Sequence, residues 1–469
     1  MSRRQWLFDA ASGLGGAALW TLLGSAGLRA ATAGPPRLPH FPPKAKRVIC
    51  LFMSGGFSQI DSFDHKPVLK QREREPLPAS VFNGRKPLGM SKLQSSFPMQ
   101  GTAFTFAQYG QSGAWMSDRF PFLAKQADRI CFVKGMVSEA VNHDPAIIFI
   151  NSGHQLPGRP SMGAWISYGL GSENHNLPAF IVMVTRKVAD QPLSSRLWDS
   201  GFLPSQHQAT PFRAGREAVL YLNNPPGLPD SLNRRGLDHL KEMETDEMAR
   251  RGDPGILARI EQYEMAFRMQ AAVPGLTDLT SEKPETLDLY GADVKSPGSF
   301  AYNCLLARRL SESGVRFVQL YHPGWDHHAY LRSGFQTNAR EIDQPAAALL
   351  QDLSDRGLLD ETLVLFITEF GRTPYSQGNL KEGGDYGREH HRDAFTCWMA
   401  GAGVKPGYSH GITDDFGFDV VQGKVTVNDF HATFLHLLGI DHERFTFPFQ
   451  GRDFRLTDVA GKLVPEILA

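Results

Sequence analysis

Short runs of apolar residues recur along the chain, and longer polar or helical stretches separate them. A run of about four to eight apolar residues that does not alternate with polar ones is typical of a strand buried on both faces. Such strands are characteristic of parallel sheets, so the pattern predicts a mainly parallel sheet. The predicted strands cover residues 48–53, 130–133, 180–184, 317–321, 363–367 and 395–399.

Between these runs, apolar residues recur at spacings of three and four, which is the period of an amphipathic helix. Helices that alternate with buried strands predict an α/β fold, here a three-layer sandwich. Residues 66–120 and 186–250 show neither period and are rich in Pro, Gly, Ser and charge, so we interpret them as surface insertions. The predicted helices cover residues 145–151, 162–170, 255–271, 302–313, 341–356 and 429–438.

The N-terminus carries an export pattern. Arg3 and Arg4 precede an uncharged stretch rich in Ala, Gly and Leu, and small residues at 31–33 form a cleavage site. We therefore predict a twin-arginine signal peptide over residues 1–33, with the twin-arginine export machinery as a partner and a periplasmic or otherwise exported location. The apolar run is too short for a good membrane span of about 20 residues, so no stable span is expected after cleavage. A retained N-terminal anchor is the alternative.

The proline-rich residues 34–46 predict an extended linker, and residues 47–469 are interpreted as one domain. The 49 Lys and Arg residues equal the 49 Asp and Glu residues, which argues against a nucleic-acid partner bound through bulk charge. The four cysteines show no CxxC spacing and lie mostly in apolar runs. They are interpreted as buried small hydrophobic residues, although a disulfide is compatible with export.

Polar side chains gather where predicted strands end. One loop holds Asp326, His327 and His328, a second holds Glu369, and a third holds His390 and His391. Carboxylate and imidazole groups from separate loops suit a divalent metal, zinc first, with calcium or manganese as alternatives. Adjacent residues rarely bind one ion, so one histidine of each pair is expected to bind it and the other to orient it or face substrate. A structural hydrogen-bond network is the alternative.

Two further groups complete the candidate site. Arg372 and Arg388 carry planar guanidinium groups that match phosphate or sulfate oxygens, or else they balance neighbouring carboxylates. Asn142 and His143 stand at the start of a predicted helix, where backbone N–H groups favour an anion or an activated side chain. Asn142 is also a good helix cap.

Several motifs in order along the chain resemble the exported bacterial family known as domain of unknown function 1501. The resemblance covers roughly residues 46–460 and rests on GGFSQIDSFDHKP, NHDPAIIFINSGHQLPGRPSMGAWISYGLGSENHNLP, GWDHH, EFGRTP, HHRDAFTCWMAGAGVKPG and NDFHATFLHLLGIDHERFTFPFQGRDFRLTDV. That family is described as similar to the alkaline phosphatase and sulfatase superfamily. The resemblance therefore implies a metal-dependent hydrolase of phosphate or sulfate esters with an alkaline phosphatase-like fold.

The resemblance also assigns residues. It implies that Asp326, with His327 or His328, and one of His390 and His391 form half of a two-metal site. In the second half Glu369 stands where the superfamily has Asp followed by His, and Asp61 or Asp64 would have to replace the aspartate that ends the first strand. Asn142 or His143 occupies the place of the nucleophile, where no hydroxyl or thiol is present.

The hypothesis from sequence is an exported metal-dependent hydrolase of sulfate or phosphate esters, acting on a small molecule or a polysaccharide. In this hypothesis Asp326, His328, His391 and Glu369 hold the metal, His143 attacks, and Arg372 or Arg388 stabilises developing charge. The alternative is a non-catalytic exported module that binds glycan or a protein in the same cleft. A metal-dependent isomerase or mutase is a weaker third reading, because it needs the absent hydroxyl.

Overall fold

The computed structural model describes residues 38–87, 89–185, 193–213, 218–220, 222–224, 227–252, 254–377 and 385–469. The predicted signal peptide and residues 34–37 of the predicted linker lie outside these ranges. Residues 38–46 form no helix or strand and lie along the end of α11 (Val427–Leu437), where His40 N donates to Gly439 O at 2.8 Å and Ala45 N to Leu437 O at 2.8 Å. None of the described helices has the length and apolar character needed to cross a membrane.

A nine-stranded sheet crosses the described part of the molecule in the order β12-β4-β11-β8-β1-β7-β5-β6, and β15 also pairs with β4. The pairs are parallel except those that β11 makes with β4 and β8, which confirms the mainly parallel sheet. All six predicted strands are present, and β4 continues past the predicted end. The strands are β1 (Arg47–Met53), β4 (Ile130–Val137), β5 (Phe180–Val184), β6 (Thr210–Phe212), β7 (Phe317–His322), β8 (Thr362–Ile367), β11 (Phe395–Ala400), β12 (Tyr408–His410) and β15 (Val425–Thr426).

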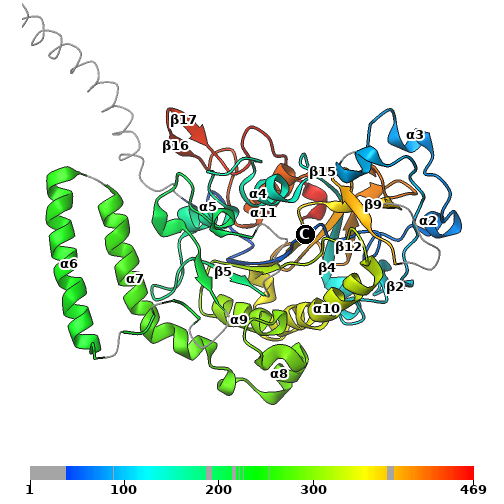
Figure 1. The fold of residues 1–469 in the computed structure, drawn as a ribbon. Helices are drawn as coiled ribbons and strands as arrows, with labels where there is room; N and C mark the ends of the chain where they lie inside the picture. Colours follow the sequence, from blue (N-terminus) through cyan, green and yellow to red (C-terminus); the bar gives the residue numbers. More distant parts are fainter. Residues whose placement is uncertain are drawn as a thin grey trace, which may run out of the picture.

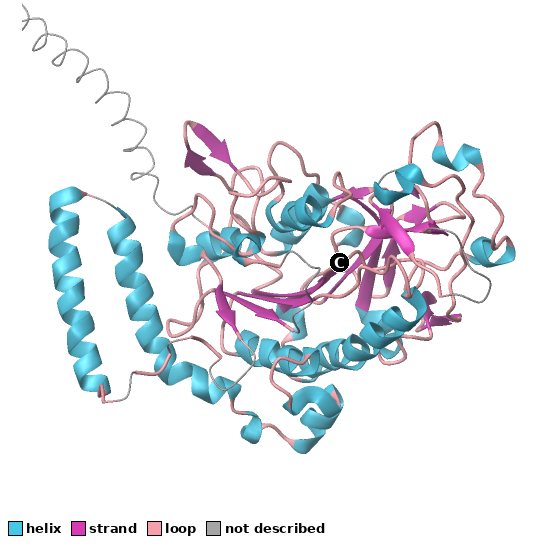
Figure 2. Ribbon diagram, viewed as in Figure 1, coloured by secondary structure: helices cyan, strands magenta, loops and turns pink. Residues whose placement is uncertain are grey.

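Two hydrophobic cores lie on the two faces of this sheet. Alternate residues of β1 divide between them: Ile49 and Leu51 belong to one core and Cys50 and Phe52 to the other. Helices α9 (Phe300–Glu312) and α10 (Leu331–Asp355) cover the first face, and α4 (His143–Ser152), α5 (Met162–Leu170) and α11 cover the second. Figures 1 and 2 show the resulting three layers, which confirm the predicted α/β sandwich.

The structure corrects the prediction for residues 186–250. Helix α6 (Asp230–Arg251) lies within this range and pairs with α7 (Pro254–Thr277) in a hairpin that projects from the sheet (Figure 1). Arg234 on α6 joins Glu264 on α7 at 2.8 Å. Because α6 is polar on most of its surface, it lacks the apolar period that would reveal a helix. Helix α10 likewise begins at Leu331 instead of residue 341, because its first turns are polar.

The remaining elements are short. The ribbon formed by β9 (Gly371–Ser376) and β10 (Arg388–His391) places Arg372 opposite His390. The four cysteines are buried free thiols, in agreement with the sequence interpretation. The other short elements are α2 (Pro67–Gln71), α3 (Ala79–Phe82), β2 (Phe106–Tyr109), β3 (Ala114–Ser117), α8 (Pro284–Tyr290), β9 (Gly371–Ser376), β10 (Arg388–His391), β13 (Ile412–Thr413), β14 (Val420–Gln422), β16 (Phe447–Phe449) and β17 (Arg452–Phe454).

Candidate metal centre

Four segments meet at the carboxyl ends of the parallel strands. Asp326 and His328 follow β7, Glu369 follows β8, and His143 opens α4 after β4. His390 reaches the same place from β10. Loops that follow parallel strands emerge at one edge of a sheet, which is where ligands bind in α/β folds. His143, Asp326, His328 and His390 form a cluster whose potential ligand atoms all lie within 4.8 Å of one another.

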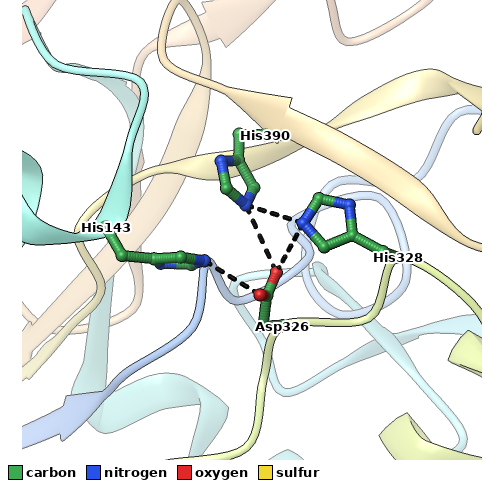
Figure 3. Close-up of side chains that lie close together, drawn as sticks. All are labelled: His143, Asp326, His328 and His390. Atoms are coloured by element: carbon green, nitrogen blue, oxygen red, sulfur yellow. Dashed lines mark hydrogen bonds and ion pairs between the residues drawn. The ribbon is translucent and has the colours of Figure 1, made fainter. Parts of the chain in front are cut away.

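Three of these side chains form a tight triangle, drawn in Figure 3. Asp326 Oδ1 lies 2.9 Å from His328 Nε2 and 3.2 Å from His390 Nε2, and the two Nε2 atoms are 3.0 Å apart. Donors bound about 2.0 Å from a tetrahedral zinc ion are about 3.3 Å apart. The triangle therefore has nearly the size of one face of a zinc tetrahedron.

The outer ring nitrogens of the histidines are each held by an acceptor. His390 Nδ1 donates to Val141 O at 2.8 Å, and His328 Nδ1 faces the side-chain oxygen of Gln377. His143 Nδ1 lies 2.7 Å from Glu369 Oε1. When Nδ1 carries the proton, Nε2 carries a lone pair, and the Nε2 atoms then point their lone pairs towards Asp326 and towards each other. Such acceptors repel one another unless a cation lies between them. The donor set therefore fits a bound metal.

His143 stands apart from the triangle because it faces the other carboxylate oxygen, with Nε2 3.1 Å from Asp326 Oδ2. Burial lowers the pKa of His143, but hydrogen bonds to Asp326 and Glu369 outweigh burial and raise it to about 9. Burial raises the pKa of Asp326, but the contacts of its oxygens with the three imidazoles in the metal-free protein, together with the nearby Arg372, hold it well below its usual range. Burial lowers the pKa of His390 to about 3, so this ring is neutral, as a metal-binding imidazole has to be.

Glu369 and Arg372 build the floor of the centre. Glu369 is fully buried and accepts Gly55 N at 2.8 Å in addition to His143. Arg372 is fully buried too, and it donates to Gly56 O at 2.8 Å, Arg388 O at 2.9 Å and Asp326 Oδ1 at 2.5 Å. Arg372 therefore fixes Asp326, and its guanidinium is closed to substrate.

Gly55 makes this floor possible. Its φ of +124° lies in a region that L side chains rarely adopt, and a Cβ there would lie 2.5 Å from Asp326 N. The turn after β1 can therefore pass directly beneath the Asp326 loop only with glycine at this position.

Other predicted site residues lie outside the cluster. Asp61 is fully buried and pairs with Arg388 at 2.8 Å, so their charges balance each other. His391 Nε2 bonds Phe418 O at 2.5 Å, and burial lowers the pKa of its ring. His327 packs against Phe335, and burial lowers its pKa to about 4. Asn142 is the exposed N-cap residue of α4, but its side chain makes no capping hydrogen bond.

Sequence reasoning missed three groups that support the centre: the carbonyl of Val141, the Gln377 side chain and Glu389. Glu389 is 1% exposed, and its Oε1 lies 3.8 Å from His328 Nδ1 and 3.9 Å from His390 Nδ1. Its position beside His390 was the available signal, whereas Val141 acts through a backbone atom that no residue type could reveal.

No curated protein matches this chain. Similar solved structures include an alkaline phosphatase from the Antarctic bacterium TAB5, which is 12% identical with a TM-score of 0.29 over 78% of this chain and 94% of that one. The lipoteichoic acid synthase LtaP from Listeria monocytogenes is 9% identical with a TM-score of 0.38 over 89% and 76%. The PsFucS1 sulfatase from Pseudoalteromonas sp. is 11% identical with a TM-score of 0.35 over 88% and 73%.

The family evidence is stronger than any single structural likeness. The profile described as "Protein of unknown function (DUF1501)" matches residues 45–468, nearly the whole range in which the sequence motifs resemble that family. The chain belongs to the DUF1501 family.

Proposed function

We propose that this protein is a metal-dependent hydrolase of phosphate or sulfate esters. The observation that carries the proposal is the triangle of Asp326 Oδ1, His328 Nε2 and His390 Nε2, with edges of 2.9, 3.0 and 3.2 Å. Three protein ligands with a further position open are typical of catalytic zinc sites, whereas structural zinc sites use four. Two imidazoles and one carboxylate favour zinc over calcium, which prefers oxygen ligands.

The charges around the triangle indicate a divalent ion. Asp326, Glu369 and Glu389 contribute three carboxylates, and Arg372 is the one guanidinium that bonds directly to this group among the described residues. A nearby cation opposes the proton on His143, and once all three imidazoles are neutral the side chains carry a surplus of two negative charges, which a doubly charged cation balances. Asp61 and Arg388 cancel as a separate pair.

When bound, the metal supplies a Lewis acid that polarises an ester oxygen. His143 is placed to move a proton, because Glu369 fixes its Nδ1 and its Nε2 points to the centre, with 14% of the side chain exposed. The N-terminus of α4, where His143 lies, adds positive potential that favours an anionic ester. In this proposal Arg372 and Arg388 support the site from below and do not contact substrate, since both are fully buried.

The first test combines metal analysis with an ester screen. We expect near-stoichiometric zinc in the purified protein and its loss in His390→Ala. His391→Ala is the matched control, because His391 neighbours His390 but bonds Phe418 O outside the cluster. Hydrolysis of an aryl phosphate or aryl sulfate by wild type, lost in His390→Ala and in His143→Gln, supports the proposal. A metal-loaded wild type that hydrolyses no phosphate or sulfate ester refutes it.

A binding module is the second candidate function. It is favoured by the residues at the start of α4, where the family resemblance places the nucleophile and this chain has Asn142 and His143, neither of which carries a hydroxyl or thiol. Zinc binding without ester turnover, together with zinc-dependent binding of a sulfated or phosphorylated glycan in calorimetry, would select this function over hydrolysis.

We also propose that the protein is exported by the twin-arginine machinery and acts outside the cytoplasm on a small-molecule or polysaccharide ester. Replacing Arg3 and Arg4 by lysine is expected to retain the protein in the cytoplasm, which cell fractionation measures. Export of this double variant at the wild-type level would contradict the signal assignment.

A further inference from the structure

Glu389 on β10 is a buried carboxylate without a cationic side chain bonded to it among the described residues. It is 1% exposed and accepts two uncharged amides, His390 N at 2.9 Å and Ser91 N at 3.1 Å. Burying a carboxylate costs several kcal/mol unless charge or hydrogen bonds compensate it. Two amide hydrogen bonds compensate part of that cost, and a cation nearby would compensate more of it.

The carboxylate lies behind two of the three triangle ligands. Glu389 Oε1 is 3.8 Å from His328 Nδ1 and 3.9 Å from His390 Nδ1, on the side of each ring away from Asp326. A negative charge at this position favours the proton on each Nδ1 and leaves each Nε2 free as a ligand. It also increases the attraction of the centre for a doubly charged ion.

We infer that Glu389 is a positioning residue whose charge favours the Nδ1 protons that His328 and His390 donate to Gln377 and to Val141 O, and that it thereby raises the affinity of the centre for a divalent metal. The inference rests on the metal centre in the proposed function and does not depend on ester hydrolysis. Carboxylates behind metal-binding histidines commonly contribute about 10- to 100-fold in metal affinity.

Glu389 also holds the turn Gly89–Leu93 in place, so the test must distinguish the effect of losing its charge from the effect of losing this contact. Ser91 N donates to Oε2, and a Cβ on Gly89 would lie 3.0 Å from the carboxyl carbon of Glu389. A matched control should lose a similar buried contact at a distance from the metal. Asp343 on α10 provides it, because this buried carboxylate accepts Phe122 N at 2.9 Å and Leu123 N at 2.8 Å, which belong to a segment that supplies no residue of the cluster.

The test measures zinc affinity of the full-length protein by competition with a chromophoric chelator. We expect Glu389→Gln to weaken zinc binding about 10- to 100-fold, whereas Asp343→Asn changes it less than about threefold. The absorption spectrum of bound cobalt should also change in Glu389→Gln, because the negative charge behind both imidazole ligands is lost. Equal zinc affinity and an unchanged cobalt spectrum in Glu389→Gln and Asp343→Asn would overturn the inference.

Glu389→Asp covers the case in which the glutamine variant does not fold. The aspartate keeps the charge but moves it away from both rings, so zinc binding should weaken about three- to tenfold by the distance dependence of the Coulomb energy. Unchanged affinity in this variant would also overturn the inference. A wild type that binds zinc but hydrolyses no ester refutes only the proposed hydrolysis, whereas a wild type that binds no zinc refutes both.

Discussion

Replacing Glu369 by glutamine should lower the pKa of His143 in the metal-free protein. Glu369 Oε1 lies 2.7 Å from His143 Nδ1, and the carboxylate is fully buried, so water screens this pair poorly. The pKa of His143 is raised from 6.5 to about 9. One pKa unit corresponds to about 1.4 kcal/mol, so the imidazolium gains about 3 kcal/mol from its surroundings.

The two carboxylates share this effect, because both bond the ring and together they overcome the opposing effect of burial. Removing one of two similar contributions should therefore lower the pKa by at least about one unit. Glutamine keeps an oxygen that can accept from Nδ1, so the ring should stay in place while the charge is lost. NMR titration of the imidazole after chelation measures the midpoint directly.

The same shift has a consequence for stability. A group whose folded pKa exceeds its unfolded value stabilises the fold below the unfolded pKa and loses that effect as pH rises through the folded pKa. The metal-free wild type should therefore lose up to about 3 kcal/mol between pH 6.5 and 9 in urea unfolding, and Glu369→Gln should lose less. Glu341→Gln is the control, because Glu341 pairs with His322 at 2.9 Å outside the cluster. A His143 midpoint in Glu369→Gln within 0.3 unit of wild type, on the order of the precision of the titration, would refute the reasoning.

Three further predictions concern the metal, the floor and the backbone. Chelation should lower the melting temperature of wild type and leave that of His390→Ala unchanged, because an ion at about 1,000 times its Kd stabilises the fold by about 4 kcal/mol. Equal melting temperatures of wild type with and without chelator would contradict a bound metal. Arg372→Lys should cost about 3 kcal/mol or more in urea unfolding, because lysine cannot serve the buried acceptors, whereas Arg85→Lys, 40% exposed, should cost less than about 1 kcal/mol. Tyr330 is 72% exposed and has a φ of 54°, so Tyr330→Gly should raise the free energy of unfolding by about 1 kcal/mol, and a loss would show that the ring makes stabilising contacts.

The sequence predicts the sheet well because a strand buried on both faces consists mainly of apolar residues, which can be recognised from the sequence. Strands β1 and β8 are almost wholly apolar, and β7 is apolar apart from Gln319 and His322. The polar segments that follow β7 and β8 supply Asp326, His328 and Glu369. Helix α6 was not predicted for the opposite reason. A helix that buries little apolar surface has few apolar residues at spacings of three and four, and this spacing is what identifies a helix in a sequence.

The roles of Arg372 and Arg388 could not be predicted, because they depend on how deeply the side chains are buried. Arg372 and Arg388 have the residue type and the neighbours expected of an oxyanion clamp, yet both side chains are fully buried. Their donors are used by backbone carbonyls, Asp326 and Asp61. Guanidinium groups satisfied in this way organise a site without being available to a ligand.

The choice within each histidine pair depends on packing beyond the local sequence. Successive residues of a strand point to opposite sides, so only one of His390 and His391 can face the centre. The register of β10 against β9 decides which of the two histidines faces the centre, because it places His390 opposite Arg372 and His391 opposite Gly371. The ring of His391 points the other way, and its Nε2 donates a hydrogen bond to Phe418 O.

The same reasoning applies to the loop after β7. His327 lies in an apolar pocket beside Phe335, and a Cβ on Gly334 would come within 2.6 Å of its ring, so this pocket depends on glycine in α10. His328, one residue later, is the ring that reaches Asp326. A histidine pair beside a carboxylate thus predicts a metal centre from its residue types, but the burial of His327 beside Phe335 decides that His328 is the ring that reaches the candidate centre.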